Sequence, residues 1–328
     1  MTVNPGGDGQ REEGASPALR MREVVRRFGA VRALDGLSLI VPRGSICGLV
    51  GPNGAGKTTA MAVVCGFLRA DEGHVDVLGQ GAFRPERHRG RVSILPQDAE
   101  LGRDMRLDEQ LEYFGRLQGL NRGEARAEVD RVLGIVDLVD RRRSRTRTLS
   151  HGMLRRVAIG QAFLGDPELV LLDEPTNGLD PRQSHAIRGY IASQRGRRTI
   201  VVSSHNLHEL ETICDYVVLM ESGRVIRQGR VDEFTGRDLE IRIELGEGSA
   251  VPLAALQAAF PEDDVRWQAE GRRLTIGVRP REGVEAEDII AQALRLLLDA
   301  GARISAVNRG RSLERAYLES THADESRG

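Results

Sequence analysis

The sequence of 328 residues has little of several features that would place it in a specialised class. Its three cysteines, Cys47, Cys65 and Cys214, show no C-x-x-C spacing, which argues against a cysteine-based metal or redox site. We predict that they are small buried hydrophobic residues. No apolar run approaches the roughly 20 residues of a membrane-spanning helix, and the first residues lack the basic and apolar regions of a secretory signal. These absences predict a cytosolic protein.

Charge of one sign is not in excess, and lysine is almost absent. The 47 basic and 48 acidic residues give a formal net charge of -1, which argues against a nucleic-acid-binding surface. Lys57 is the only lysine, and every other basic residue is arginine. This bias indicates a GC-rich coding genome, in which lysine persists only where arginine cannot replace it.

That lysine lies in the stretch around which the chain is organised, and residues 51–58 match G-x-x-x-x-G-K-[ST]. A strand is predicted over residues 45–50 and a helix from about Lys57. The glycine-rich loop between them would therefore place a bound phosphate at a helix N-terminus, which favours anions. The compact ammonium of Lys57 fits against the β- and γ-phosphates, where a planar guanidinium would be too large. The predicted nucleotide-binding residues are Gly51, Pro52, Asn53, Gly54, Ala55, Gly56, Lys57, Thr58 and Thr59.

Polar residues follow three other predicted strands, at the edge where open α/β sheets bind ligands. The apolar run 169–172 ends in Asp173 and Glu174, and adjacent carboxylates there are costly unless a cation neutralises them. We therefore predict Asp173 on Mg²⁺ and Glu174 facing a water molecule. Gln97 follows the strand 92–95, where its amide could contact the Mg²⁺ shell or the attacking water. His205 follows the strand 199–203, and its position alone leaves a structural and a functional role open.

Other segments surround these residues. Strands over 21–27 and 37–41 flank Phe28, whose ring could stack on an adenine or belong to the core. Residues from about 98 to 165 have helical spacing and predict a helical insertion, in which Ser150 is the N-cap of a helix reaching Leu164. The arginine-rich run 141–147 is interpreted as a solvated loop, with a phosphate or partner contact as the alternative.

A second pattern begins after residue 230. It predicts, in order, strand 239–245, helix 253–260, hairpin strands 265–269 and 273–278, helix 286–298, strand 303–307 and helix 312–318. This order predicts a small two-layer α+β unit of ferredoxin-like type. The predicted division is a disordered N-terminal arm over 1–17, a nucleotide-binding unit over 18–230, the α+β unit over 238–320 and a tail over 321–328.

Together, the motifs of residues 18–230 resemble the ATP-binding cassette of ABC transporters. The resemblance implies an α/β fold of the P-loop NTPase class, with a parallel-sheet core, a small antiparallel β subdomain and a helical subdomain. It implies the following roles: residues 51–58 as the Walker A loop, Thr58 and Asp173 as Mg²⁺ ligands, Gln97 as the Q-loop, Glu174 as the catalytic base, Asp180 as the D-loop aspartate, His205 as the switch histidine and Phe28 as the adenine-stacking aromatic.

The sequence L-S-H-G-M at residues 149–153 resembles the family signature L-S-G-G-Q. Ser150 and Gly152 match the signature, whereas His151 and Met153 depart from it. In the family, these two matching residues contact the γ-phosphate of an ATP that is bound to a second cassette. The resemblance therefore implies a homodimer or heterodimer of cassettes with ATP and Mg²⁺ as cofactors.

The sequence L-E-R-A-Y-L at residues 313–318 is similar to the terminal helix of ATPases from ABC-2 type exporters, including antibiotic-resistance exporters. The leading hypothesis is therefore an ATP-hydrolysing exporter subunit, peripheral on the inner face of the cell membrane through a separate integral-membrane permease. The alternatives are an importer ATPase and a soluble ABC ATPase that acts on ribosomes or DNA. The latter usually carries two cassettes or a long coiled coil, and this chain has one cassette and no sustained heptads.

Overall fold

The computed structural model describes residues 16–99, 101–235, 239–246, 249, 253, 256, 259, 265–278 and 286–309. By internal contacts the chain forms two compact units, one with the described residues up to 47, 54–203 and 222–224, and one with 48–53, 204–221 and the described residues from 225 onward. Of the predicted N-terminal arm, only Ser16 and Pro17 are among the described residues, and Ser16 accepts a hydrogen bond on its carbonyl from Arg43 Nε (2.9 Å).

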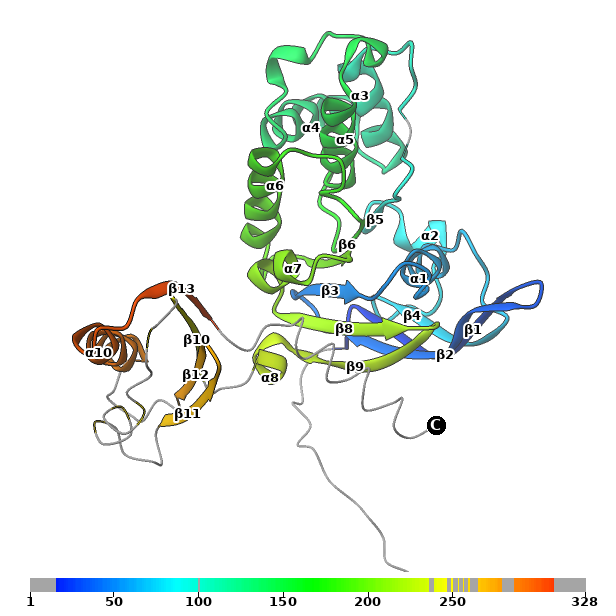
Figure 1. The fold of residues 1–328 in the computed structure, drawn as a ribbon. Coiled ribbons are helices and arrows are strands. Elements are labelled where there is room, and N and C mark those ends of the chain that lie inside the picture. Colours follow the sequence, from blue (N-terminus) through cyan, green and yellow to red (C-terminus); the bar gives the residue numbers. More distant parts are fainter. Residues whose placement is uncertain are drawn as a thin grey trace, which may run out of the picture. The chain divides into compact units, whose positions relative to one another are not determined.

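A three-stranded antiparallel sheet has the order β2-β1-β4 (Figure 1). Its strands are β1 (Leu19–Phe28), β2 (Val31–Val41) and β4 (Glu72–Val77). Met21, Leu37 and Leu39 are buried, as the alternation of apolar residues along β1 and β2 predicts, and a register shift between Met21 and Val24 allows Val24 to be buried as well. The predicted antiparallel strands are therefore confirmed, and β2 begins earlier than its apolar pattern indicated.

The second sheet has six strands in the order β5-β6-β7-β3-β8-β9. They are β3 (Ile46–Val50), β5 (Val92–Leu95), β6 (Leu169–Asp173), β7 (Thr199–Ser204), β8 (Tyr216–Glu221) and β9 (Arg224–Arg230). β6 is parallel to both β5 and β7, with Leu172 opposite Leu95 and Val202. This register brings the residues that follow β5 and β6 to one edge of the sheet, next to the end of β7.

The helices fall between these strands. They are α1 (Lys57–Val64), α2 (Pro85–His88), α3 (Leu107–Leu117), α4 (Arg122–Ile135), α5 (His151–Ala162), α6 (Pro181–Ser193), α7 (Leu207–Ile213) and α8 (Val231–Thr235). Single 3₁₀ turns lie at Val139–Arg141 and Thr146–Thr148. The segment predicted as a helical insertion contains α3, α4 and α5, which lie side by side (Figure 1).

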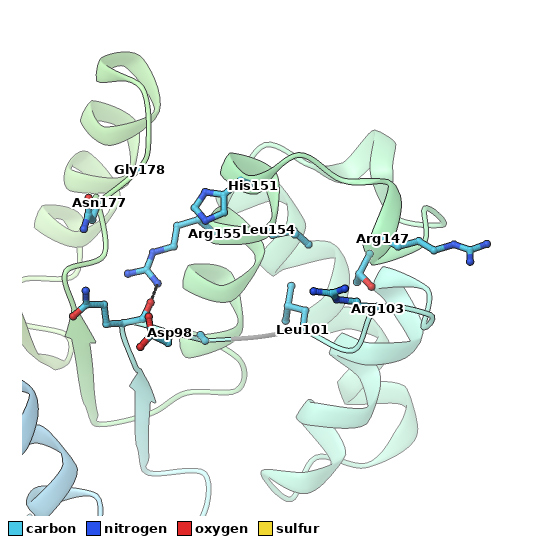
Figure 2. A pocket seen from close by; sticks show the side chains of 12 residues that line it. Asp98, Leu101, Arg103, Arg147, His151, Leu154, Arg155, Asn177 and Gly178 are labelled. Atoms are coloured by element: carbon cyan, nitrogen blue, oxygen red, sulfur yellow. Dashed lines mark hydrogen bonds between the residues drawn. The ribbon is translucent and has the colours of Figure 1, made fainter.

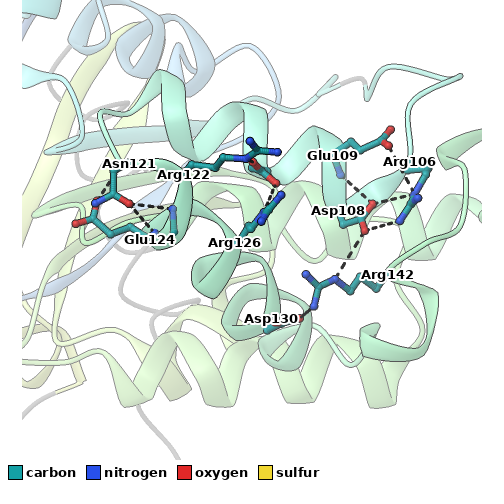
Figure 3. Close-up of polar contacts among 11 residues, drawn as sticks. Arg106, Asp108, Glu109, Asn121, Arg122, Glu124, Arg126, Asp130 and Arg142 are labelled. Atoms are coloured by element: carbon teal, nitrogen blue, oxygen red, sulfur yellow. Dashed lines mark hydrogen bonds and ion pairs between the residues drawn. The ribbon is translucent and has the colours of Figure 1, made fainter.

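Polar contacts fix the start of α4 and join the helices of this layer (Figure 3). Asn121 Oδ1 accepts hydrogen bonds from the N–H groups of Gly123 and Glu124, and Glu124 Oε2 accepts one from the Asn121 N–H, which is a capping box. Arg142, from the arginine-rich run, pairs with Asp108 of α3 and Asp130 of α4. The run is thus held in part by acidic groups of its own chain.

The C-terminal sheet is antiparallel with the order β11-β12-β10-β13. Its elements are β10 (Leu239–Leu245), β11 (Val265–Glu270), β12 (Arg273–Val278), α10 (Ala286–Asp299) and β13 (Ile304–Arg309). Ile243 and Leu274 of the sheet form one buried core with Ala293 and Leu297 of α10. The hairpin, the amphipathic helix and the last strand are as predicted, whereas the predicted terminal helix over 312–318 and most of the helix over 253–260 lie outside the described residues.

Two further predictions concern buried or membrane-spanning segments. Cys47, Cys65 and Cys214 are buried free thiols, as predicted. Within the ranges that the structure describes, no helix combines the length and the apolar character that crossing a membrane requires.

Candidate nucleotide site

The glycine-rich loop joins β3 to α1 in a conformation that only glycine adopts without strain. Gly54 and Gly56 have φ values of +84° and +97°. A Cβ on Gly56 would lie 2.6 Å from the carbonyl oxygen of Ala33, so a side chain has no room there. Gly56 is also the N-cap of α1, and no side chain caps that helix. The first N–H groups of α1 therefore meet no competing capping side chain when an anion approaches.

Lys57 is the first residue of α1 and its side chain shares one electrostatic environment with the two carboxylates at the end of β6. It is only 7% exposed. Burial lowers the pKa of Lys57 below its usual value, and the negative charges of Glu174 and Asp173 partly oppose this decrease. Thr58, the next residue of α1, is exposed to solvent. The structure thus brings together Lys57, Asp173 and Glu174.

Asp173 has one satisfied and one unsatisfied carboxylate oxygen. It is the last residue of β6, whose apolar residues are all fully buried, and it is itself buried. Its Oδ1 accepts a hydrogen bond from Ser203 Oγ, whereas Oδ2 is buried and has no hydrogen-bond partner within the described part of the chain. A buried oxygen without a partner is costly, and a carboxylate oxygen is a preferred ligand of Mg²⁺. The residues present therefore fit a metal ion at this position.

Glu174 follows Asp173 with a backbone conformation that is rare for a residue with a side chain. Its φ is +47°, and residues in this region cost about 1–3 kcal/mol unless their surroundings hold them. Both of its backbone polar groups are held: the N–H donates to Ser203 Oγ (2.9 Å), and the carbonyl accepts from Arg155 Nη2 (2.7 Å). The hydroxyl of Ser203 therefore connects the Glu174 backbone with the Asp173 carboxylate.

Arg155 of α5 connects the two loops that carry the predicted polar residues. Its Nη1 donates to the Gln97 carbonyl (2.8 Å), and its Nη2 also donates to the Asp173 carbonyl (2.9 Å). The side chain is 9% exposed, and burial lowers its pKa while the charges of nearby acidic groups oppose that shift. Through Arg155 the structure links the backbone of Gln97 to the cluster.

The predicted signature and D-loop residues lie at two helix starts. Ser150 is the N-cap of α5, as predicted, and its Oγ accepts a hydrogen bond from the Met153 N–H (3.3 Å). Asp180 is the N-cap of α6 and accepts a hydrogen bond from the Gln183 N–H (2.8 Å). Both residues are exposed, and a Cβ on Gly152 would lie 3.4 Å from Gln183 Oε1, so the two helix starts are close.

Comparisons with known proteins place this geometry in a family. A family model described as ABC transporter matches residues 34–177. The chain is 35% identical over 290 residues to a daunorubicin resistance ATP-binding protein of Streptomyces coeruleorubidus, a match that covers 84% of this chain and 92% of that protein. The chain belongs to the ATP-binding proteins of ABC transporters.

Other relatives agree with this membership. A Nod factor export ATP-binding protein I of Ralstonia nicotianae is 34% identical over 267 residues, covering 80% of this chain and 81% of the relative. A solved structure of an ATP-binding subunit of an ABC transporter has a TM-score of 0.61 and 30% identity, and covers 66% of this chain and 91% of that one. These matches confirm the predicted α/β P-loop NTPase cassette.

A cavity of about 640 Å³ lies beside the Q-loop and the signature of this cassette (Figure 2). Gln97 and Asp98 line it, together with His151 and Arg155, which both extend from α5. His151 replaces a glycine of the family signature, and its Cε1 would lie 3.4 Å from a Cβ on Gly178. The departure from the signature thus places an imidazole against the D-loop.

Two predicted residues stand at strand ends. Phe28 ends β1 and is 45% exposed, with the Arg26 guanidinium 4.9 Å from its ring centroid, so the alternative of a core aromatic is wrong. His205 directly follows β7 and is exposed. In the described residues, Phe28, Ser150 and Asp180 make no hydrogen bond or ion pair with the cluster of Lys57 and the carboxylates, so their contacts with nucleotide stay predictions.

Sequence reasoning missed two residues of the site, Ser203 and Arg155. Ser203 is a fully buried hydroxyl at the end of the apolar strand β7. Its position after an apolar run could have identified it, because a buried hydroxyl needs a hydrogen-bond partner. Arg155 is adjacent to a second arginine, and nothing in the sequence showed which of the two is buried.

Proposed function

We propose that this chain is the ATP-hydrolysing subunit of an ABC exporter. The observation that carries the proposal is the buried, unpartnered Oδ2 of Asp173 in one electrostatic environment with Lys57 and Glu174. Together with the glycine-rich loop, this arrangement supplies a metal ligand, a cation for the phosphates and a carboxylate base. The names of the relatives, daunorubicin resistance and Nod factor export, favour export over the alternatives of import or a soluble role.

In ATP hydrolysis, water and ATP give ADP and phosphate, and each residue of the site would have a separate role in this reaction. Asp173 Oδ2 and the Thr58 hydroxyl would hold Mg²⁺, which neutralises phosphate charge when bound. Lys57 would stabilise charge on the β- and γ-phosphates from its place at the N-terminus of α1. Glu174 would accept a proton from the attacking water, and Gln97 and His205 would act on the water or the γ-phosphate.

The proposal includes two partners. Ser150, Gly152 and Asp180 lie at exposed or half-exposed helix starts, where they would contact an ATP bound to a second cassette. A separate integral-membrane permease would hold the dimer at the inner face of the cell membrane. No nucleic acid is expected as a partner, because the formal net charge is -1.

The first test is hydrolysis by the purified chain and by Glu174→Gln. The wild type should release phosphate from Mg²⁺-ATP, and the variant should bind ATP with similar affinity while its turnover falls by about 10² or more, because the amide cannot accept the proton. A variant that hydrolyses ATP at nearly the wild-type rate would contradict the assignment of the base. Absence of hydrolysis by the wild type, alone and with its permease, would contradict the proposed function.

The second test concerns direction and partner. The chain should be tagged in its own host and purified from detergent-solubilised membranes, and the co-purifying integral-membrane polypeptide should be identified by mass spectrometry. A permease of the ABC-2 exporter type is the expected result. Recovery of an importer permease, or of ribosomes in place of a membrane protein, would contradict export.

A further inference from the structure

The side chain of Arg155 binds both loops of the proposed site. It projects from α5 toward the Q-loop (Figure 2). Its two terminal nitrogens donate to the backbone carbonyls of Gln97, Asp173 and Glu174 at 2.7 to 2.9 Å, and Nη1 also donates to the Pro96 carbonyl at 3.5 Å. Gln97 follows β5, and the other two residues end or follow β6, so one guanidinium connects the ends of two neighbouring parallel strands.

The contact to Glu174 has a particular importance, because the backbone there needs external support. Glu174 has a φ of +47° although it carries a side chain. The direction of a side chain follows from the backbone dihedrals of its residue, so the bonds that hold this conformation also set where the carboxylate points. The Glu174 carbonyl accepts from Arg155 Nη2 (2.7 Å) and, at a longer distance, from the Asn177 N–H (3.2 Å), and the Glu174 N–H donates to Ser203 Oγ.

The environment of Arg155 also favours a specific role over general packing. Its guanidinium is buried, whereas the neighbouring Arg156 is half-buried, and the Nε of each has no hydrogen-bond partner in the described part of the chain. Burying a charge with an unsatisfied donor is costly. The hydrogen bonds from the two terminal nitrogens therefore account for the buried guanidinium, and lysine cannot reproduce their planar geometry.

We propose that Arg155 is a positioning residue for ATP hydrolysis, which holds the Glu174 backbone and the Q-loop in one arrangement through their carbonyl groups. This inference rests on the proposed hydrolytic function. Arg155 itself does not have to touch the nucleotide, and it acts through Glu174 and Gln97.

The adjacent residue Arg156 provides a matched control. It lies on the same helix, and its Nη1 also donates to backbone carbonyls, those of Val136 (2.8 Å) and Asp137 (3.3 Å). Those carbonyls follow α4 within the helical layer and do not belong to the Q-loop or to the loop of Glu174. A purely structural role for carbonyl-binding arginines on α5 would give both positions similar effects.

The experiment compares the wild type, Arg155→Met, Arg155→Lys and Arg156→Met. For Arg155→Met we expect kcat to fall by about 10- to 100-fold, because the carbonyls of the Q-loop, Asp173 and Glu174 lose a charged donor. The Kd for ATP should change by less than about threefold, because Lys57 and its loop are unchanged. Arg155→Lys should be intermediate, since it keeps the charge but loses the fork. Arg156→Met should keep kcat within about twofold of the wild type at a comparable Tm.

A measurement that needs no activity separates this inference from the proposed function. Hydrogen exchange followed by mass spectrometry should show faster exchange in peptides covering residues 97–99 and 173–177 in Arg155→Met, and not in Arg156→Met. A wild type that fails to hydrolyse ATP while these peptides respond would refute the proposed function and leave the positioning role supported. Unchanged exchange and wild-type kcat in Arg155→Met, or equal losses of kcat in both methionine variants, would overturn the inference. If Arg155→Met does not fold, Arg155→Lys and Arg156→Lys make the same comparison.

Discussion

Alanine at Gly56 should destabilise the protein more than alanine at Gly54, although both glycines have positive φ. With φ values of +97° and +84°, either alanine would enter the left-handed region, at a cost of about 1–2 kcal/mol. A Cβ at Gly54 would have no atom within 4 Å, whereas one at Gly56 would lie 2.6 Å from the Ala33 carbonyl oxygen. Because that neighbour is backbone of β2, the loop or the strand must move, and overpacking of this kind costs about 1–3 kcal/mol more.

Thermal unfolding without nucleotide measures this difference. Each kcal/mol shifts Tm by about 2–4 °C in a domain of roughly 150–250 residues, so Gly56→Ala should melt at least about 2 °C below Gly54→Ala. A titration with a fluorescent ATP analogue should also give the weaker affinity for Gly56→Ala, because a shifted loop displaces the neighbouring Lys57. Equal Tm values for the two variants, or a Tm of Gly56→Ala equal to that of the wild type, would refute the steric argument.

Three further predictions concern the signature, the single lysine and a buried thiol. Ser150→Arg should leave ATP binding to the monomer intact but abolish dimer formation and turnover, measured by light scattering and phosphate release; full activity of this variant would refute the two-cassette site. Because burial lowers the pKa of Lys57, its reactive neutral amine is populated at lower pH than in the unfolded chain, and bound phosphates should reverse this shift. Acylation of Lys57, read by mass spectrometry against pH, should therefore be suppressed by Mg²⁺-ATP, whereas labelling of the N-terminus should not change. Burial raises the pKa of Cys65 to about 12, so iodoacetamide at pH 8 should modify it only after unfolding, and rapid modification of the native protein would contradict this.

The nucleotide loop and the acidic pair could be predicted from the sequence because their residues are contiguous. Residues 51–58 and the pair of Asp173 and Glu174 each combine an apolar strand with the polar residues that follow it. A motif of this kind contains both the side chains and the backbone that positions them. The N-cap Ser150 shows the same principle, since the N–H group that it binds is only three residues away.

The residues that support this site could not be predicted, because their partners are distant in sequence. Arg155 binds backbone carbonyls 18, 19, 58 and 59 residues away, and carbonyl groups leave no trace in the residue types of a sequence. Ser203 binds Glu174 from 29 residues away. The arginine-rich run shows the same limit, since its composition predicts exposure but not the ion pair between Arg142 and Asp130 of α4.

The helix α5 carries Ser150 at its N-cap and Arg155 within its second turn. A helix of 12 residues tilts or shifts as one rigid rod, so a displacement of Ser150 also displaces the donors that hold Glu174. In a dimer of the proposed kind, Ser150 would contact the ATP bound to the second cassette. Arg155 would hold the backbone of Glu174, the proposed base, in its own cassette. The position of α5 would then couple the two sites. Binding of ATP at one site would change the position of the Glu174 backbone, and therefore hydrolysis, at the other.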